Sequence, residues 1–200
     1  DFMLEVSIIR PGATTFDESG RIKGGLDIPL SSKGIEQAEQ LSKTFQTIKL
    51  DCLYVAPCLS AQTTADQIAE RNFCRQRTLD CMRNLDHGLW QGKLVSEIRR
   101  LQPTIYRQFQ ESPDNVCPPG GETLNHARQR VESTLEKLVL KHKGGCVGFL
   151  VPEPMASIVQ CYFGGGAIGE IWKREQDSGT FERIELHHLP VDGQLQSISA

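Results

Sequence analysis

The segment at residues 10–38, RPGATTFDESGRIKGGLDIPLSSKGIEQA, connects an apolar stretch to an amphipathic one. Before it, LEVSIIR at residues 4–10 places Val6 and Ile8 on one face, which predicts a first strand. Pro11 and Gly12 end that strand, and a loop rich in glycine and charged residues follows. Ser31 or Ser32 is a candidate N-cap. The helix predicted after it buries a stripe of residues at helical spacing, namely Ile35, Ala38, Leu41, Phe45 and Ile48.

The segments that follow repeat this order of strand and helix. DCLYVA at residues 51–56 predicts a second strand, and residues 59–71 predict a helix that packs through alanines and Ile68. Residues 120–142 carry a long helical stripe, followed by a strand at 146–151, a helix at 152–163 and a final strand near 181–186. The alternation predicts an α/β fold in which helices cover a mainly parallel sheet.

The length and composition predict one domain over residues 1–200. A chain of 200 residues with 38% hydrophobic content is long enough to bury one sizeable core. An insertion at about 80–120, with two short helical stretches separated at Pro103, is expected to cap a pocket. The glycines in GGGAIG at 164–169 follow a helix instead of a strand, so we interpret them as a helix C-cap and not as a dinucleotide loop. Residues 187–200 are expected to form an irregular tail.

Several classes of function are disfavoured. The net charge is −3 and the 22 basic residues are scattered, so we expect no nucleic-acid partner. No apolar run is long enough to span a bilayer, so we expect no membrane association. The seven cysteines are odd in number and form no C-x-x-C pair, which favours a reducing, cytoplasmic location. No group of residues has metal-ligand spacing, and we expect neither a metal nor a cofactor.

The opening segment resembles the first motif of the histidine phosphatase superfamily, the phosphoglycerate mutase-like proteins. That motif is R-H-G-E-T-x-x-N-x-x-G-R-x-Q-G-x-x-D-x-P-L-T-x-x-G-x-x-Q-A, and it aligns with residues 10–38 without a gap. YVAPCLSAQTTA at 54–65, MRNLDHGLWQG at 82–92 and PPGGET at 118–123 resemble later motifs of the family in the right order. The resemblance covers residues 4–160 and implies a three-layer α/β/α sandwich with a mainly parallel central sheet.

The same resemblance implies that most of the family's catalytic groups are replaced. The family uses two histidines, two arginines and a carboxylic acid to transfer a phosphoryl group. The nucleophilic histidine falls on Pro11, the second histidine, from the family's S-H-G, on Pro152, the second arginine on Ser60 and the acid on Asn84. Of the central set only Arg10 is retained. The implied protein is a catalytically inactive, phosphatase-like pseudoenzyme.

Two functions follow from this interpretation. The leading one is an inactive protein that binds a protein partner or a small anionic or phosphorylated ligand, through Arg10, Gly12, Thr14, Arg21, Lys23, Ser60, Asn84 and His87. The alternative is an active phosphatase or mutase-like hydrolase that uses His87 or Cys58 as a substitute residue. The sequence leaves two roles open for Arg10. It either binds an anion or forms an ion pair within the protein, with Asp17, Glu122 or Glu153 as the candidate partner.

Overall fold

A computed structural model describes residues 2–168 and 177–189, and its centre is a five-stranded sheet. The strand order is β3-β2-β4-β1-β5, with β1 at Leu4–Ile9, β2 at Cys52–Val55, β3 at Arg75–Thr78, β4 at Cys146–Leu150 and β5 at Phe181–Leu186. The first four strands are parallel, and β5 runs antiparallel along the β1 edge. This confirms the predicted α/β fold with a mainly parallel sheet.

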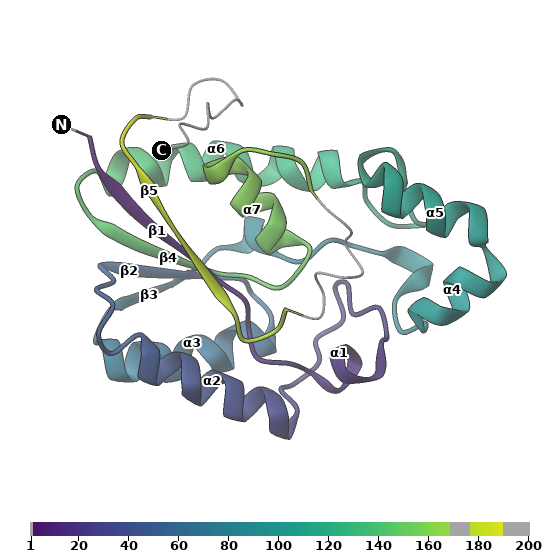
Figure 1. Cartoon of the computed structure of the whole chain (residues 1–200), viewed down its shortest axis with the longest axis horizontal. Helices are drawn as coiled ribbons and strands as arrows, with labels where there is room; N and C mark the ends of the chain where they lie inside the picture. Colours follow the sequence, from purple (N-terminus) through teal and green to yellow (C-terminus); the bar gives the residue numbers. More distant parts are fainter. Residues whose placement is uncertain (1, 169–176, 190–200) are drawn as a thin grey trace.

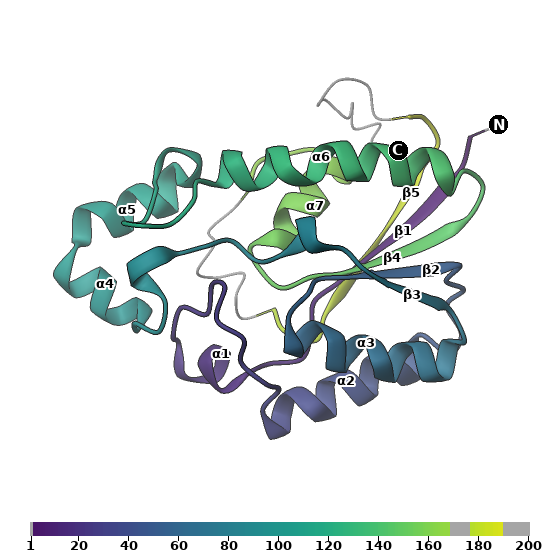
Figure 2. The same ribbon diagram turned by 180° about the vertical axis from the view of Figure 1, so that it is seen from behind.

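Helices cover both faces of the sheet, as Figures 1 and 2 show. Helices α2 (Ser32–Thr44) and α3 (Leu59–Asn72) lie on one face, and α6 (Leu124–Lys141) and α7 (Met155–Gly164) lie on the other. The short helices α1 (Thr15–Ser19), α4 (Val95–Leu101) and α5 (Pro103–Glu111) lie beyond the carboxyl ends of the parallel strands. The three predicted layers are therefore present. The predicted insertion supplies α4 and α5, which separate at Pro103 as expected.

Helix α2 begins as the sequence predicts, but one residue of its predicted buried stripe is exposed. The Ser31 hydroxyl accepts a hydrogen bond from the Gly34 amide at 3.1 Å, as an N-cap does. Ile35, however, is 50% exposed, because the face turned toward the protein at this point is formed by Gly34. A Cβ atom on Gly34 would lie 1.9 Å from the Ala13 carbonyl oxygen. The glycine therefore lets α2 pack directly against the loop that follows β1.

The core lies on both faces of the central strands. The apolar side chains of β1 are fully buried, and α7 packs against this strand. The predicted stripe of α6 is also buried, namely Leu124, Ala127, Val131, Leu135 and Val139. Strand β3 is different, because its sequence is RQRT and its side chains are mostly exposed at the sheet edge. Charged residues on an edge strand prevent further strands from pairing with it, and such a strand carries no alternating apolar signal in the sequence.

The strand order determines where a site can form. Strands β1 and β2 follow each other in the chain, but β4 lies between them in the sheet. The loops after β1 and β2 lead to helices on one face of the sheet, whereas the loop after β4, which lies between them, leads to α7 on the opposite face. In open α/β sheets the crevice at the carboxyl ends of such strands is the usual place for ligands.

Phe73, directly after α3, adopts a backbone conformation that costs stability. Its φ is 57° and its side chain is 92% exposed, so the ring offsets little of that cost. The left-handed conformation costs a residue with a Cβ atom about 1–2 kcal/mol. Phe73→Gly is expected to raise the free energy of unfolding by about 1 kcal/mol in urea denaturation. Phe73→Ala keeps the Cβ atom and is the control; an equal gain in that variant would contradict this explanation.

Candidate functional site

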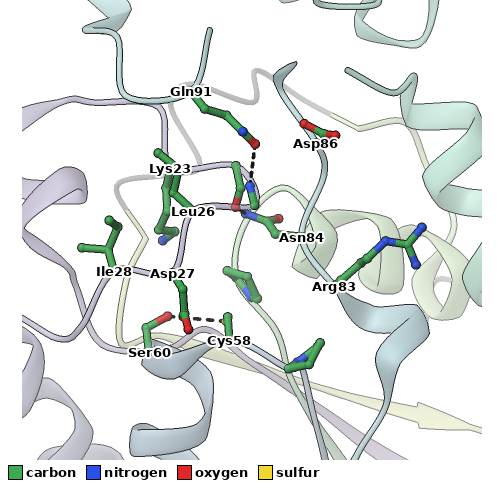
Figure 3. Close-up of a pocket in the computed structure, with 14 residues that line it drawn as sticks. Lys23, Leu26, Asp27, Ile28, Cys58, Ser60, Arg83, Asn84, Asp86 and Gln91 are labelled. Atoms are coloured by element: carbon green, nitrogen blue, oxygen red, sulfur yellow. Dashed lines mark hydrogen bonds between the residues drawn. The ribbon is translucent and has the colours of Figure 1, made fainter. Parts of the chain in front are cut away.

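Two cavities lie at the carboxyl ends of the parallel strands, on either side of Pro152. The larger one has a volume of about 350 Å³ and is shown in Figure 3. Its walls are the loop at 23–28, the start of α3, the segment at 83–91 and Pro152. The smaller one, of about 10 Å³, has room for about one water molecule. It is lined by residues that follow β1 and β4, including Arg10, Pro11 and Glu153.

Arg10, at the end of β1, is held in a buried ion pair. Its side chain is 3% exposed, and its Nε donates a hydrogen bond of 2.7 Å to Glu153 Oε1. Its Nη2 donates a second one, of 3.2 Å, to Glu182 Oε1 on β5. Burial by itself lowers the pKa of Arg10, but the carboxylates of Glu153 and Glu182 outweigh that effect and raise it. Of the two states left open by the sequence, the structure shows the internal ion pair.

The other carboxylate oxygen of Glu153 also has partners within the protein. Glu153 Oε2 accepts a hydrogen bond of 2.8 Å from the Ser157 hydroxyl and one of 3.2 Å from the Ser157 amide. Both oxygens are therefore satisfied, and the carboxylate is fixed between β1 and the first turn of α7. Among the three partners expected from the sequence, Glu153 is the one that pairs with Arg10, and Glu182 is a partner that the sequence gave no reason to expect.

The loop after Pro11 directs its amides at side chains of the protein. The Gly12 amide donates to Thr64 Oγ1 at 3.1 Å, and the Ala13 amide donates to Gln37 Oε1 at 2.8 Å. The next amide, that of Thr14, donates to Asp17 Oδ2 at 2.7 Å. Consecutive amides of this kind form a common cradle for phosphate groups. Here each of the three is already engaged by an internal acceptor.

The two cations expected beside Arg10 are engaged as well. Lys23 Nζ lies 3.0 Å and 3.1 Å from the two carboxylate oxygens of Asp17, and both groups are largely buried. Arg21 Nη1 donates a hydrogen bond of 2.8 Å to the Gly92 carbonyl and lines neither cavity. Lys23 borders both cavities, but its charge is balanced by Asp17. Lys23 is therefore neutralised by its partner, and Arg21 lies outside both cavities, so neither residue supplies a positive charge for a ligand there.

The larger cavity brings together three residues that the sequence singled out at distant positions. Ser60 and Cys58 line its floor at the start of α3, with 3.7 Å between the hydroxyl oxygen and the sulfur. Asn84 lines the opposite wall and donates a hydrogen bond of 3.0 Å to the Gly24 carbonyl, which ties that wall to the loop at 23–28. These residues are neutral and polar, and they are suited to hydrogen bonding.

His87 lies outside both cavities. It is fully buried beneath the insertion, where its ring centroid lies 6.0 Å from that of Phe109 on α5, and it lines neither cavity. Burial lowers the pKa of His87 to about 4, although the nearby carboxylates of Asp86 and Glu122 act in the opposite direction. The imidazole is therefore neutral at physiological pH and packs as part of the core.

A buried ion pair fixes the segment that carries Asn84 and His87. Arg130 on α6 binds the Glu122 carboxylate with hydrogen bonds of 2.7 Å and 3.3 Å and also donates to the Asn84 carbonyl. Burial by itself raises the pKa of Glu122, but the hydrogen bonds from Arg130 and His126 outweigh it and lower the pKa. Glu122 also accepts a hydrogen bond from the Asp86 amide. This wall of the cavity is therefore held by the helical layer behind it.

The charges around the two cavities favour ligands that are not anions. Among the residues that the structure describes, the cations that line them are Arg10, Lys23 and Arg83, and the carboxylates that line them are Asp17, Asp27, Asp86 and Glu153. Glu182 adds a further carboxylate on the other side of Arg10. Within this described part of the lining, an anion meets more negative than positive side chains, which disfavours its binding.

The described residues give no sign of a metal site or a membrane span. Within residues 2–168 and 177–189, no three histidine, cysteine, aspartate or glutamate residues gather in a group that could hold a metal ion. In the same ranges, no helix combines the length and apolar character needed to cross a membrane. The proposed C-cap glycines at 164–168 do end α7, with Gly165 at a φ of 73°, while residue 169 and the tail from 190 onward lie outside the described residues.

Proteins of similar sequence are named as phosphatases and mutases. The chain is 28% identical to phosphoserine phosphatase 1 of Hydrogenobacter thermophilus, over 92% of this chain and 87% of that protein. It is 30% identical to a metal-independent phosphoserine phosphatase of Arabidopsis thaliana over 70% of this chain, and the match spans 60% of that protein's length. A probable phosphoglycerate mutase of Salmonella newport is 26% identical over 66% of this chain and 62% of its own length.

Solved structures and a family profile agree on the fold. A protein of Bacillus stearothermophilus, YhfR, superposes with a TM-score of 0.81 at 23% identity, covering 96% of this chain and 98% of its own. A mycobacterial glucosyl-3-phosphoglycerate phosphatase gives a TM-score of 0.80 at 19% identity over 92% of this chain and 91% of its own. Residues 6–191 match the profile of the histidine phosphatase superfamily, branch 1. The profile spans nearly the whole chain, which therefore belongs to the histidine phosphatase superfamily.

Proposed function

We propose that this chain is a superfamily member without phosphohistidine chemistry, which uses the cavity beside its former catalytic position to bind a small molecule. The observation that carries the proposal is the environment of Pro11. In the family motif this position holds the nucleophilic histidine, and proline has neither a nucleophilic side chain nor an amide hydrogen to offer a phosphate group. Its neighbour Arg10 is engaged by Glu153 at 2.7 Å.

The surroundings of Pro11 support the same conclusion. The three amides after Pro11 are engaged by side chains, and the residues at the family's other catalytic positions, Ser60, Asn84 and Pro152, are uncharged. Phosphoryl transfer depends on positive groups that stabilise the charge of the transferring oxygens. Loss of the nucleophile removes the covalent route, and loss of the charge stabilisers lowers the affinity for phosphate in the first place.

The proposal predicts that the purified chain does not hydrolyse phosphate esters. With p-nitrophenyl phosphate and O-phosphoserine, between about pH 4 and pH 9, the rate is expected to equal that of buffer alone. Rapid quenching with labelled substrate is expected to give no acid-labile phosphoprotein, because no histidine stands at position 11. Turnover that persists through successive purification steps in constant proportion to the protein would overturn the proposal.

A second candidate function is a phosphatase that uses Cys58 as its nucleophile. Two observations favour it, namely the names of the similar proteins and the position of Cys58 on the floor of the larger cavity. His87, the other substitute residue considered from the sequence, is fully buried outside that cavity. If this second candidate holds, Cys58→Ser abolishes the activity, while Cys117→Ser leaves it intact because Cys117 is exposed and lines neither cavity.

A further inference from the structure

We propose that the larger cavity binds a small uncharged polyhydroxyl compound of monosaccharide size, and that Glu153 makes the site reject the phosphorylated form of the same compound. This inference rests on the proposed function and specifies its ligand class. It starts from three properties of the cavity, which are its volume, its mixture of polar and apolar walls, and the balance of charge around it.

The volume of the cavity suits a small ligand. About 350 Å³ lies at the lower end of the ~300–1,000 Å³ range of small-molecule sites. The cavity is bordered by the loop at 23–28 on one side and by residues of the insertion on the other, and Figure 3 shows their side chains around a shared space. A ring of five or six atoms with its substituents fits this space.

The polar lining combines donors and acceptors. Ser60 contributes a hydroxyl group, Asn84 and Gln91 contribute amides, and Asp27 contributes a carboxylate. A hydroxyl group both donates and accepts hydrogen bonds, so a ligand that carries several of them can match such a mixed set. A phosphate group mainly accepts, and it would meet the carboxylates of Asp27 and Asp86 beside two cations, Arg83 and Lys23, the second of which is already paired with Asp17.

The apolar lining complements a ring. Leu26, Ile28, Pro57 and Pro152 contribute apolar side chains to the same cavity. A sugar ring presents C–H groups on its faces and hydroxyl groups on its edge, and binding sites generally place apolar side chains together with a few oriented polar groups. The lining therefore matches a molecule that is polar at its edge and apolar on its face.

Glu153 explains why a phosphorylated compound is rejected. In the family pattern S-H-G the glycine falls on Glu153, so the smallest residue is replaced by a carboxylate beside Pro152, the residue that separates the two cavities. That carboxylate occupies the Nε donor of Arg10, and together with Glu182 it more than balances the positive charge of the buried guanidinium, which is the charge that would otherwise attract a phosphate group. Glu153 is thus a specificity-determining residue, and its action requires no contact with the sugar itself.

The test compares matched pairs of compounds that differ only in phosphate. Calorimetric titrations of the full chain use D-glucose with D-glucose 6-phosphate, and D-ribose with D-ribose 5-phosphate. In the wild-type chain the free sugar of at least one pair is expected to bind about tenfold or more tightly than its phosphate ester. In Glu153→Gln, which removes the charge but keeps the length and hydrogen-bonding atoms, the preference is expected to reverse. Glu39→Gln, which removes an exposed carboxylate paired with Lys43 on α2, is the control and keeps the wild-type preference.

The outcomes separate this inference from the proposed function. Inorganic phosphate is assayed in the same samples, and its release from the esters would overturn the proposed function. No release together with tighter binding of the esters, or no binding of either sugar, would overturn only the ligand class. Should Glu153→Gln fail to fold, Glu182→Gln tests the same idea, because Glu182 is half-buried and contacts the same guanidinium. A shift in that variant toward the esters supports the role of the carboxylates, and an unchanged preference contradicts it.

Discussion

Glu153→Ala is expected to lower the free energy of unfolding by about 3–5 kcal/mol, because it leaves a buried guanidinium without its main partner. The Arg10 and Glu153 side chains are 3% and 5% exposed and lie 2.7 Å apart. The change also removes the acceptor of the Ser157 hydroxyl and amide, so further buried donors lose their partner. Glu182 offsets only part of this loss, since its contact with Arg10 is longer and partly exposed to solvent. Urea denaturation at neutral pH measures the effect.

A double variant separates the cost of breaking the pair from its net contribution to stability. Arg10→Met combined with Glu153→Leu removes both charges, and replacing both members of a buried pair with apolar residues is often neutral or stabilising. We therefore expect the double variant to be more stable than Glu153→Ala. In the cycle formed by Arg10→Met, Glu153→Leu and the double variant, we expect a coupling free energy of about 2 kcal/mol or more. Additive effects of the two single changes would show that the two side chains do not interact in solution.

The pattern of apolar residues was sufficient to predict an α/β fold with a mainly parallel sheet, and the resemblance of four ordered motifs implied its three layers. Val6 and Ile8 on β1, the stripe on α6 and the serine cap of α2 are all local signals, and the structure places them as these signals indicate. The errors occurred where a local pattern competed with a tertiary contact. Ile35 continues the apolar spacing of α2, but the close approach of Gly34 to the Ala13 carbonyl turns that side chain toward solvent.

The position of the candidate site was predictable from the sequence, but the internal partners that occupy its hydrogen-bond donors were not. Motifs placed Arg10, Ser60 and Asn84 at one end of the sheet, and they do border the two cavities there. The partners that occupy the donors come from elsewhere in the chain, because Glu182 lies 172 residues after Arg10 and Thr64 lies 52 residues after Gly12. No spacing in the sequence connects such residues. The antiparallel pairing of β5 with β1 brings Glu182 beside Arg10, and the packing of α3 brings Thr64 beside the loop.

The second large effect is expected from His87, whose burial makes the stability of the protein depend on pH. The pKa of His87 is lowered from 6.5 to about 4 by burial, so the unfolded chain takes up a proton at a higher pH than the folded chain does. The contribution of His87 to stability is fully present above pH 6.5 and is lost as the pH falls toward 4. The loss amounts to about 3 kcal/mol once the pH is below the folded pKa.

His87→Leu removes this titration while leaving an apolar side chain of similar size next to Phe109 and Trp90. The difference in unfolding free energy between the wild-type chain and this variant is expected to change by about 3 kcal/mol between pH 7 and pH 4, with the wild type losing more. Carboxylates such as Glu122, whose pKa is lowered in the fold, titrate in both proteins and cancel in the difference. His188→Gln, which replaces an exposed histidine, is measured alongside as the control for substitution of a histidine outside the core. If the unfolding free energies of the wild type and His87→Leu changed equally with pH, His87 would take up its proton in the folded state without cost. That result would mean that the insertion opens to water over this pH range.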